Sequence, residues 1–249
     1  MLPVRTRTWG LAAATACLIT AMQGTPAAAT QGTATSLGSK TVRLSNERTV
    51  TVWAHPLVGA AVRSGPDVDR RRVATLRLLT EDGRPEVYVV LTRRTTASDE
   101  WLRIRIPGRP NGRKGWVRRD SLGPLRSNHR RLVVDRRTLH VKLYNSGHLI
   151  FHARVGTGKR TTPTPGGRYW IREKLKFGRS ALYGRYALGT SAYAPSLSEW
   201  PGGGVIGIHG TSEPELIPGR PSHGCVRVRN RAMARLWRLT PIGTPLWIR

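Results

Sequence analysis

Short runs in which apolar and polar side chains alternate, separated by glycine, proline and asparagine, recur from residue 41 to the end of the chain. The clearest run is Trp101 to Ile106, where Leu102 and the two isoleucines share one face and two arginines the other. This two-residue period is typical of strands with one face on a core. We therefore expect a mainly β fold, with further strands at residues 50–53, 74–79, 87–91, 115–117, 132–134, 139–143, 149–155, 169–171, 205–209 and 245–248.

Helical periodicity is confined to a short stretch near the end of the chain. Met233, Leu236 and Trp237 share one helical face, so we predict a helix over residues 231–239, capped by Asn230 and ended by a proline at 241. Residues 145–147 predict a hairpin turn, and residues 183–200, aromatic and without a clear period, predict a loop.

The first 29 residues have the layout of a secretory signal. Arginines at 5 and 7 precede an apolar run, and Ala27 to Ala29 fit cleavage by signal peptidase. We expect a signal peptide at 1–29, a linker at 30–40, secretion to the cell wall or an equivalent space, and no membrane span after cleavage. Retention as an uncleaved anchor is the alternative.

Positive charge dominates the composition. Lysine and arginine number 42 against 14 acidic residues, a formal charge of +28. Such a chain is attracted to polyanions, so anionic cell-wall polymers are possible partners. The basic residues are scattered and no nucleic-acid motif accompanies them, so no nucleic-acid partner is predicted. An arginine-rich proteome would produce much of the same bias without any binding role.

Cys225 is the only cysteine left once the signal, with Cys17, is removed. A lone thiol in an oxidising compartment calls for a chemical role, because it has no disulfide partner within the chain. As a nucleophile it needs a nearby base, and His209 and His223 are the candidates. One alternative is an inert buried cysteine, and another is a zinc site formed by Cys225, His209 and His223. A zinc site would need a fourth ligand, and none stands at a recognisable spacing in the sequence, so no metal is predicted.

The spacing of His209 and the run from Ser222 to Cys225, Ser-His-Gly-Cys, resembles the catalytic motif of the L,D-transpeptidase, or YkuD, family. Supporting matches are VGTGKRTTPTPGG from residue 155, LGTSAY from 188, GVIGIHGT from 204 and the final PIGTPLWIR. The resemblance covers residues 130–249. It implies a β-sandwich catalytic domain with one or two short helices and no cofactor.

The resemblance also implies roles for single residues. Cys225 would be the nucleophile and His209 the base, oriented by the backbone carbonyl of Gly210, with His223 a second catalytic candidate. Ser222 and Gly224 would shape the oxyanion and donor sites. Arg227 stands where the family usually has asparagine, which alters the substrate contact at that position.

A first domain is predicted at residues 41–124, and residues 41–122 resemble a bacterial SH3-like domain, chiefly through WLRIRIPGRPNGRKGWVRRDSL from residue 101. The resemblance implies a small barrel that binds or orients on the wall. The arginine run at residues 70–72 is read as a solvated loop.

The resemblance to the L,D-transpeptidase family implies that the chain is a cysteine-dependent peptidoglycan L,D-transpeptidase. It would form cross-links between the diamino acids of stem peptides, through a thioester on Cys225 with release of D-alanine. A cysteine carboxypeptidase or amidase on wall peptides uses the same residues and stays an alternative. A non-catalytic wall-binding protein is the other.

Overall fold

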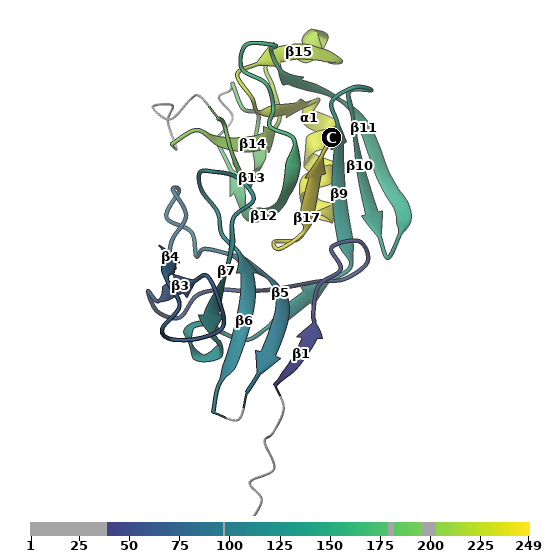
Figure 1. The fold of residues 1–249 in the computed structure, drawn as a ribbon. Helices are drawn as coiled ribbons and strands as arrows, with labels where there is room; N and C mark the ends of the chain where they lie inside the picture. Colours follow the sequence, from purple (N-terminus) through teal and green to yellow (C-terminus); the bar gives the residue numbers. More distant parts are fainter. Residues whose placement is uncertain (1–38, 97, 179–181, 196–202) are drawn as a thin grey trace, which may run out of the picture. The chain divides into compact units, whose positions relative to one another are not determined.

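Two β-sheets make up most of the described part of the chain (Figure 1). The computed structural model describes residues 39–96, 98–178, 182–195 and 203–249. The predicted signal peptide and all but the last two residues of the predicted linker lie outside the described residues. The chain is mainly β, as predicted. Among the described residues, no helix is long and apolar enough to cross a membrane.

The first sheet has eight strands, in the order β4-β3-β7-β6-β5-β2-β8 with β1 added to β5. Its core holds side chains from the alternating faces, among them Leu102, Ile104 and Val117, none of them exposed. The strands are β1 (Lys40–Arg43), β2 (Thr51–Ala54), β3 (Ala61–Arg63), β4 (Arg72–Thr75), β5 (Tyr88–Thr95), β6 (Glu100–Arg105), β7 (Lys114–Arg118) and β8 (Arg126–Asn128), with a 3-10 turn at Arg119–Ser121.

Two expectations for this sheet need correction. The strand predicted at 74–79 lies earlier, at Arg72–Thr75, because Leu78 and Leu79 are 46% and 55% exposed and the chain turns away at Thr80. Arg105, expected on the solvent face of its strand, is instead buried, with its Nε 2.7 Å from Oε1 of Glu47. The acidic partner lies far away in sequence, so alternation alone does not reveal it.

The second sheet follows the order β10-β9-β17-β12-β13-β14-β16-β11-β15, and an added pairing of β10 with β11 closes it into a ring. The ring encloses the larger apolar core. Its strands are β9 (Arg130–Asp135), β10 (His140–Asn145), β11 (His148–Gly158), β12 (Gly167–Lys176), β13 (Tyr186–Tyr193), β14 (Val205–His209), β15 (Gly219–Ser222), β16 (Val226–Val228) and β17 (Pro245–Ile248). A 3-10 turn at Pro214–Leu216 precedes β15, and α1 (Asn230–Leu239) follows β16.

The predicted hairpin turn and helix are confirmed, with one change. Ser146 and Gly147 join β10 to β11 with φ of 48° and 91°. Helix α1, the one α-helix among the described residues, buries Met233 and Leu236 as expected. Asn230 is not its cap, because it is the first helical residue and its side-chain amide bonds Thr211 instead.

Strand β13 corrects the loop predicted from residue 183. Residues 187–193 are buried almost without interruption, so both faces of the strand are covered. A strand buried on both faces has no polar side to alternate with, and its period is invisible in the sequence.

Buried contacts join the two sheets. Nε of Arg172, on β12, donates to Oε1 of Glu86 at 2.7 Å, and its NH2 lies 2.9 Å from Oε2 of Glu81. Nε1 of Trp170 donates to the carbonyl oxygen of Val87 at 2.7 Å. The described residues from 39 to 249 belong to one compact unit. The division at 41–124 and 130–249, and the SH3-like identity of the first part, stay predictions.

Candidate active site

Strand pairing brings the predicted nucleophile and base together. Strands β14 and β16 are parallel neighbours, with His209 opposite Arg227 and Ile208 opposite Val226. Cys225 immediately precedes β16, and His209 is the last residue of β14. The two side chains line the same two cavities. The sixteen-residue separation in sequence (225 minus 209) is therefore bridged by a single strand-to-strand contact.

His209 is buried and held in one orientation. Its Nδ1 donates to the backbone oxygen of Gly210 at 2.6 Å, which leaves Nε2 without the proton in the neutral ring. Burial lowers the pKa of His209 to about 4, and the charge of Arg227 acts in the same direction against the Gly210 carbonyl. The ring of Tyr183 meets it edge-on, with centroids 4.8 Å apart. The imidazole is thus neutral and able to accept a proton.

Cys225 rests as a thiol. Burial raises the pKa of Cys225, although the N–H of Gly207, 3.4 Å from Sγ, and the charge of Arg227 both favour the thiolate. A cysteine in this state attacks only when a base removes its proton. His209, a neutral imidazole that lines the same cavities as Cys225, is the candidate base.

A tight turn presents the thiol. The hydroxyl of Ser222 donates to the Cys225 carbonyl at 2.6 Å and accepts from the N–H of Gly224 at 3.1 Å. Thr164 donates to the Gly224 carbonyl at 2.7 Å. Gly224 has φ of 129°, and a Cβ there would lie 2.8 Å from Cδ1 of Ile206. Backbone conformation and packing both require glycine at this position.

Asn230, predicted from the sequence only as a helix cap, and Thr164 both support the site and were not predicted as site residues. Nδ2 of Asn230 donates to the Thr211 carbonyl and its Oδ1 accepts from the Thr211 N–H, both at 2.9 Å, which fixes the backbone after His209. Gly210 lies against this side chain, since a Cβ would be 2.1 Å from Oδ1 of Asn230. The proline-rich loop and the helix start were visible in the sequence, but not their side-chain partners.

The remaining predicted site residues lie around the thiol. His223 is exposed and lines the first cavity together with Ser222 and Arg227. The guanidinium of Arg227 forms an ion pair with Glu213, from the loop before β15. The charge of Arg227 also acts on both His209 and Cys225, where it lowers the pKa of each group.

Two cavities meet at the catalytic pair, with volumes of about 230 and 250 Å³. Four residues line both cavities: Tyr183, Val205, His209 and Cys225. Within the described ranges, no three histidine, cysteine, aspartate or glutamate side chains gather closely enough to hold a metal ion.

Comparison with known proteins points in the same direction. Residues 129–248 match the family model of the L,D-transpeptidase catalytic domain, YkuD. Bacillus subtilis YqjB, a candidate L,D-transpeptidase, is 30% identical over 127 residues, which cover 47% of this chain and 69% of that protein. Bacillus licheniformis YkuD, another candidate, is 31% identical over 114 residues, which cover 46% of this chain and 62% of that protein.

Solved structures show a more distant likeness. An Enterococcus faecium L,D-transpeptidase is 24% identical with a TM-score of 0.38, covering 48% of this chain and 49% of the other. The chain thus spans about half the length of that structure. An L,D-transpeptidase from Mycobacterium smegmatis is 13% identical with a TM-score of 0.40, covering 80% of this chain and 99% of the other.

Proposed function

The chain belongs to the L,D-transpeptidase family, and we propose that it cross-links peptidoglycan stem peptides through a thioester on Cys225. One observation carries this proposal. A neutral histidine at the end of β14, with its Nδ1 held by a carbonyl, and a cysteine thiol just before the neighbouring parallel strand β16 line the same cavities. This is the nucleophile-and-base arrangement that acyl transfer requires.

In the first half-reaction Sγ of Cys225 attacks the carbonyl carbon before the terminal D-alanine, and Nε2 of His209 takes the thiol proton. The bond to D-alanine breaks, and the leaving amine receives that proton. Backbone N–H groups of the turn at Ser222 to Cys225 are suited to stabilise the oxyanion. The products are D-alanine and an acyl-enzyme.

In the second half-reaction a neutral amine of another stem attacks the thioester carbon. His209 takes a proton from the attacking nitrogen, the carbon–sulfur bond breaks and the thiolate recovers the proton. The product is an amide between two diamino acids. Every step uses groups of this chain and needs no metal or organic cofactor.

The neighbouring residues have separate tasks in this scheme. Gly210 orients His209 through its carbonyl, while Ser222 and Gly224 hold the turn that presents Cys225. Arg227 lines the first cavity, where its guanidinium suits a carboxylate of the donor. His223, exposed in the same cavity, is placed to contact the donor.

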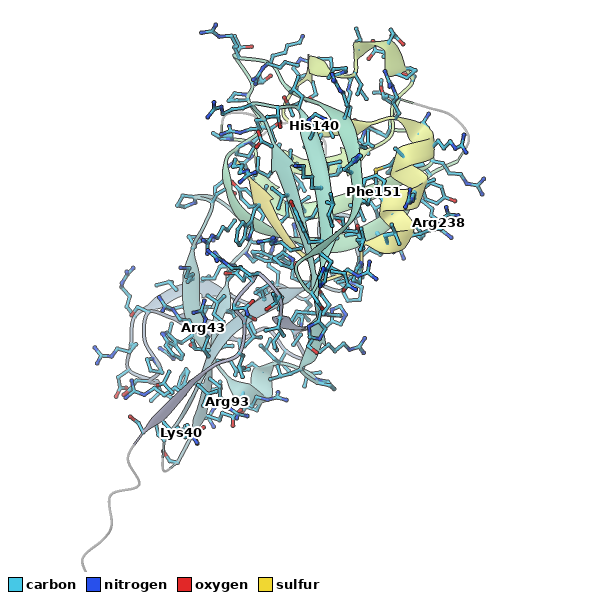
Figure 2. All side chains as sticks on the ribbon, turned by 90° about the vertical axis from the view of Figure 1, so that its right-hand side faces the viewer. Lys40, Arg43, Arg93, His140, Phe151 and Arg238 are labelled. Carbon is cyan, nitrogen blue, oxygen red and sulfur yellow. The ribbon has the colours of Figure 1, made fainter. Side chains whose placement is uncertain are left out.

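We further propose that the protein is secreted and that its first sheet binds anionic wall polymers as an SH3-like module. Figure 2 shows Lys40, Arg43 and Arg93 extending from β1 and β5 of the first sheet. Co-sedimentation with peptidoglycan sacculi tests the proposed binding to the wall. The substitutions Lys40→Gln, Arg43→Gln and Arg93→Gln together should release the protein at lower salt. Equal retention would contradict the proposal.

The activity test is intact-protein mass spectrometry with a disaccharide tetrapeptide, using Cys225→Ala as the control. We expect an acyl adduct on the native enzyme alone, release of D-alanine and formation of a cross-linked dimer. An adduct that ends only in free tripeptide would assign a carboxypeptidase. Absence of an adduct would leave a non-catalytic wall-binding protein.

A further inference from the structure

The two cavities at Cys225 differ in the charge of their walls. Beyond their four shared residues, the first is lined by Arg227 and His223, and the second by Asp82 and Glu173. The first cavity therefore has a cationic group in its wall, and the second cavity has two carboxyl groups in its wall. In a chain of net charge +28, an acidic wall at this position is unexpected.

Glu173, on β12, is the inner of the two acids and is 2% exposed. Its Oε2 accepts from the hydroxyl of Thr80 at 2.7 Å, and Asp82 lies two residues further along the same turn of the first sheet. Burial raises the pKa of Glu173 to about 7, with Asp82 adding to the rise against the effect of Thr80 and Arg172.

In the described part of the chain, neither Asp82 nor Glu173 forms an ion pair, and the guanidinium of Arg172 is engaged with Glu81 and Glu86. A buried carboxyl without a counter-ion is destabilised in its charged form, and an incoming cation relieves that cost.

Between the carboxyl of Glu173 and the Sγ of Cys225, the second cavity has a glycine floor, formed by Gly189 and Gly207. Glu173 pairs with Gly189, Gly189 pairs with Gly207, and the N–H of Gly207 donates to Sγ of Cys225. Both glycines line the second cavity. Two strand spacings of about 4.8 Å each set the length of this floor. A Cβ at Gly189 would lie 2.4 Å from Oε1 of Glu173, so any larger residue at position 189 would block the path between Glu173 and Cys225.

We propose that the second cavity is the acceptor site, in which Glu173 and Asp82 bind the primary amine of the acceptor stem as an ammonium ion. This assignment rests on the proposed transpeptidase function. The donor, which ends in a carboxylate, then occupies the first cavity beside Arg227. The ammonium gives one proton to the Glu173 carboxylate, which later releases it to solvent, and the resulting neutral amine moves along the glycine floor. Its nitrogen then bonds to the thioester carbon as the carbon–sulfur bond breaks, and its second proton passes through His209 to sulfur.

The test separates the two half-reactions in Asp82→Asn and Glu173→Gln, with Asp69→Asn, an exposed acid of the first sheet, as matched control. Mass spectrometry follows acylation of Cys225 by the disaccharide tetrapeptide. The acyl-enzyme is then offered either a disaccharide tripeptide with a free side-chain amine or hydroxylamine, which is uncharged at neutral pH.

We expect KM for the tripeptide acceptor to rise about tenfold in each variant, the size typical of a lost hydrogen bond to a charged group. The effect should spare hydroxylamine and acylation, and Asp69→Asn should match the native enzyme. If Glu173→Gln does not fold, Asp82→Asn decides alone, because Asp82 is exposed.

Three results would overturn the assignment: equal loss with both nucleophiles, slower acylation as the main effect, or an unchanged KM for the tripeptide. Failure of the native enzyme to acylate at all would instead refute the proposed function, and the acceptor site with it.

Discussion

Substitution of Glu86 by glutamine should strongly destabilise the protein without touching the catalytic groups. Glu86 and Arg172 are both fully buried, and they meet through two hydrogen bonds, one of 2.7 Å between Nε and Oε1. Arg77 also contacts Glu86, with NH2 3.2 Å from Oε2. Removal of the carboxylate charge leaves the Arg172 guanidinium in the interior with Glu81 as its remaining acidic partner.

The magnitude follows from this geometry. Breaking one side of a buried ion pair costs roughly 3–5 kcal/mol, because an uncompensated charge is left behind. Glu81 retains part of the compensation, so we expect the lower end, about 3 kcal/mol. For a chain of this size, that lowers the melting temperature by roughly 6–12 °C.

The assay is urea unfolding followed by tryptophan fluorescence, on Glu86→Gln, Arg172→Met and the double variant. The double variant should recover much of the loss, because no buried charge is then left without its partner. Asp120→Asn, which removes an ion pair whose acid is 69% exposed, is the control and should change the free energy of unfolding by less than about 0.5 kcal/mol. An equally small change in Glu86→Gln would refute the reasoning. We also expect the buried charge of Arg172 to destabilise a fragment that begins at residue 129, because that fragment lacks both Glu81 and Glu86.

Three further results are expected. Because the pKa of His209 is lowered to about 4, its imidazole should stay unprotonated, and the acylation rate should be maintained, down to about that pH. A fall of the acylation rate centred near pH 6.5 would contradict the buried neutral ring. As the pH falls below 6.5, His209 takes up a proton in the unfolded chain before it does so in the folded protein. The contribution of His209 to the free energy of unfolding is therefore complete above pH 6.5 and falls as the pH drops towards 4, which chemical denaturation should show. Gly224→Ala should lower the acylation rate of Cys225 at least tenfold, because a Cβ is strained at φ of 129° and would clash with Ile206, so the turn must shift. The assay is tetrapeptide turnover, and a near-native rate would show that the turn tolerates a side chain.

The local parts of the fold were predictable, and the contacts between distant segments were not. The strand at Trp101, the hairpin at residues 145–147 and the helix after residue 230 announce themselves by period or turn chemistry. Strand β13 does not, because it is covered on both faces. The partnership of Glu86 with Arg172 depends on how two sheets meet, which no periodicity encodes.

The candidate site divides in the same way. The four residues from Ser222 to Cys225 are contiguous, and they carry the resemblance that led to the nucleophile. The wall formed by Glu173 and Asp82 joins acids some ninety positions apart in sequence (173 minus 82). Glu173 is related to Cys225 by the strand register through Gly189 and Gly207, and Asp82 by lining the same cavity.

The base is oriented by a main-chain oxygen, that of Gly210, and not by a carboxylate side chain. This has a genetic consequence. Every amino acid at position 210 has the same backbone carbonyl, so no missense change removes the oxygen that orients His209. Loss of function through this contact must come from displacement, by a larger residue at 210 that strikes Asn230 or by a change at Asn230 that frees the loop. In a saturation-mutagenesis screen, sensitivity should therefore follow side-chain volume at 210 and amide chemistry at 230.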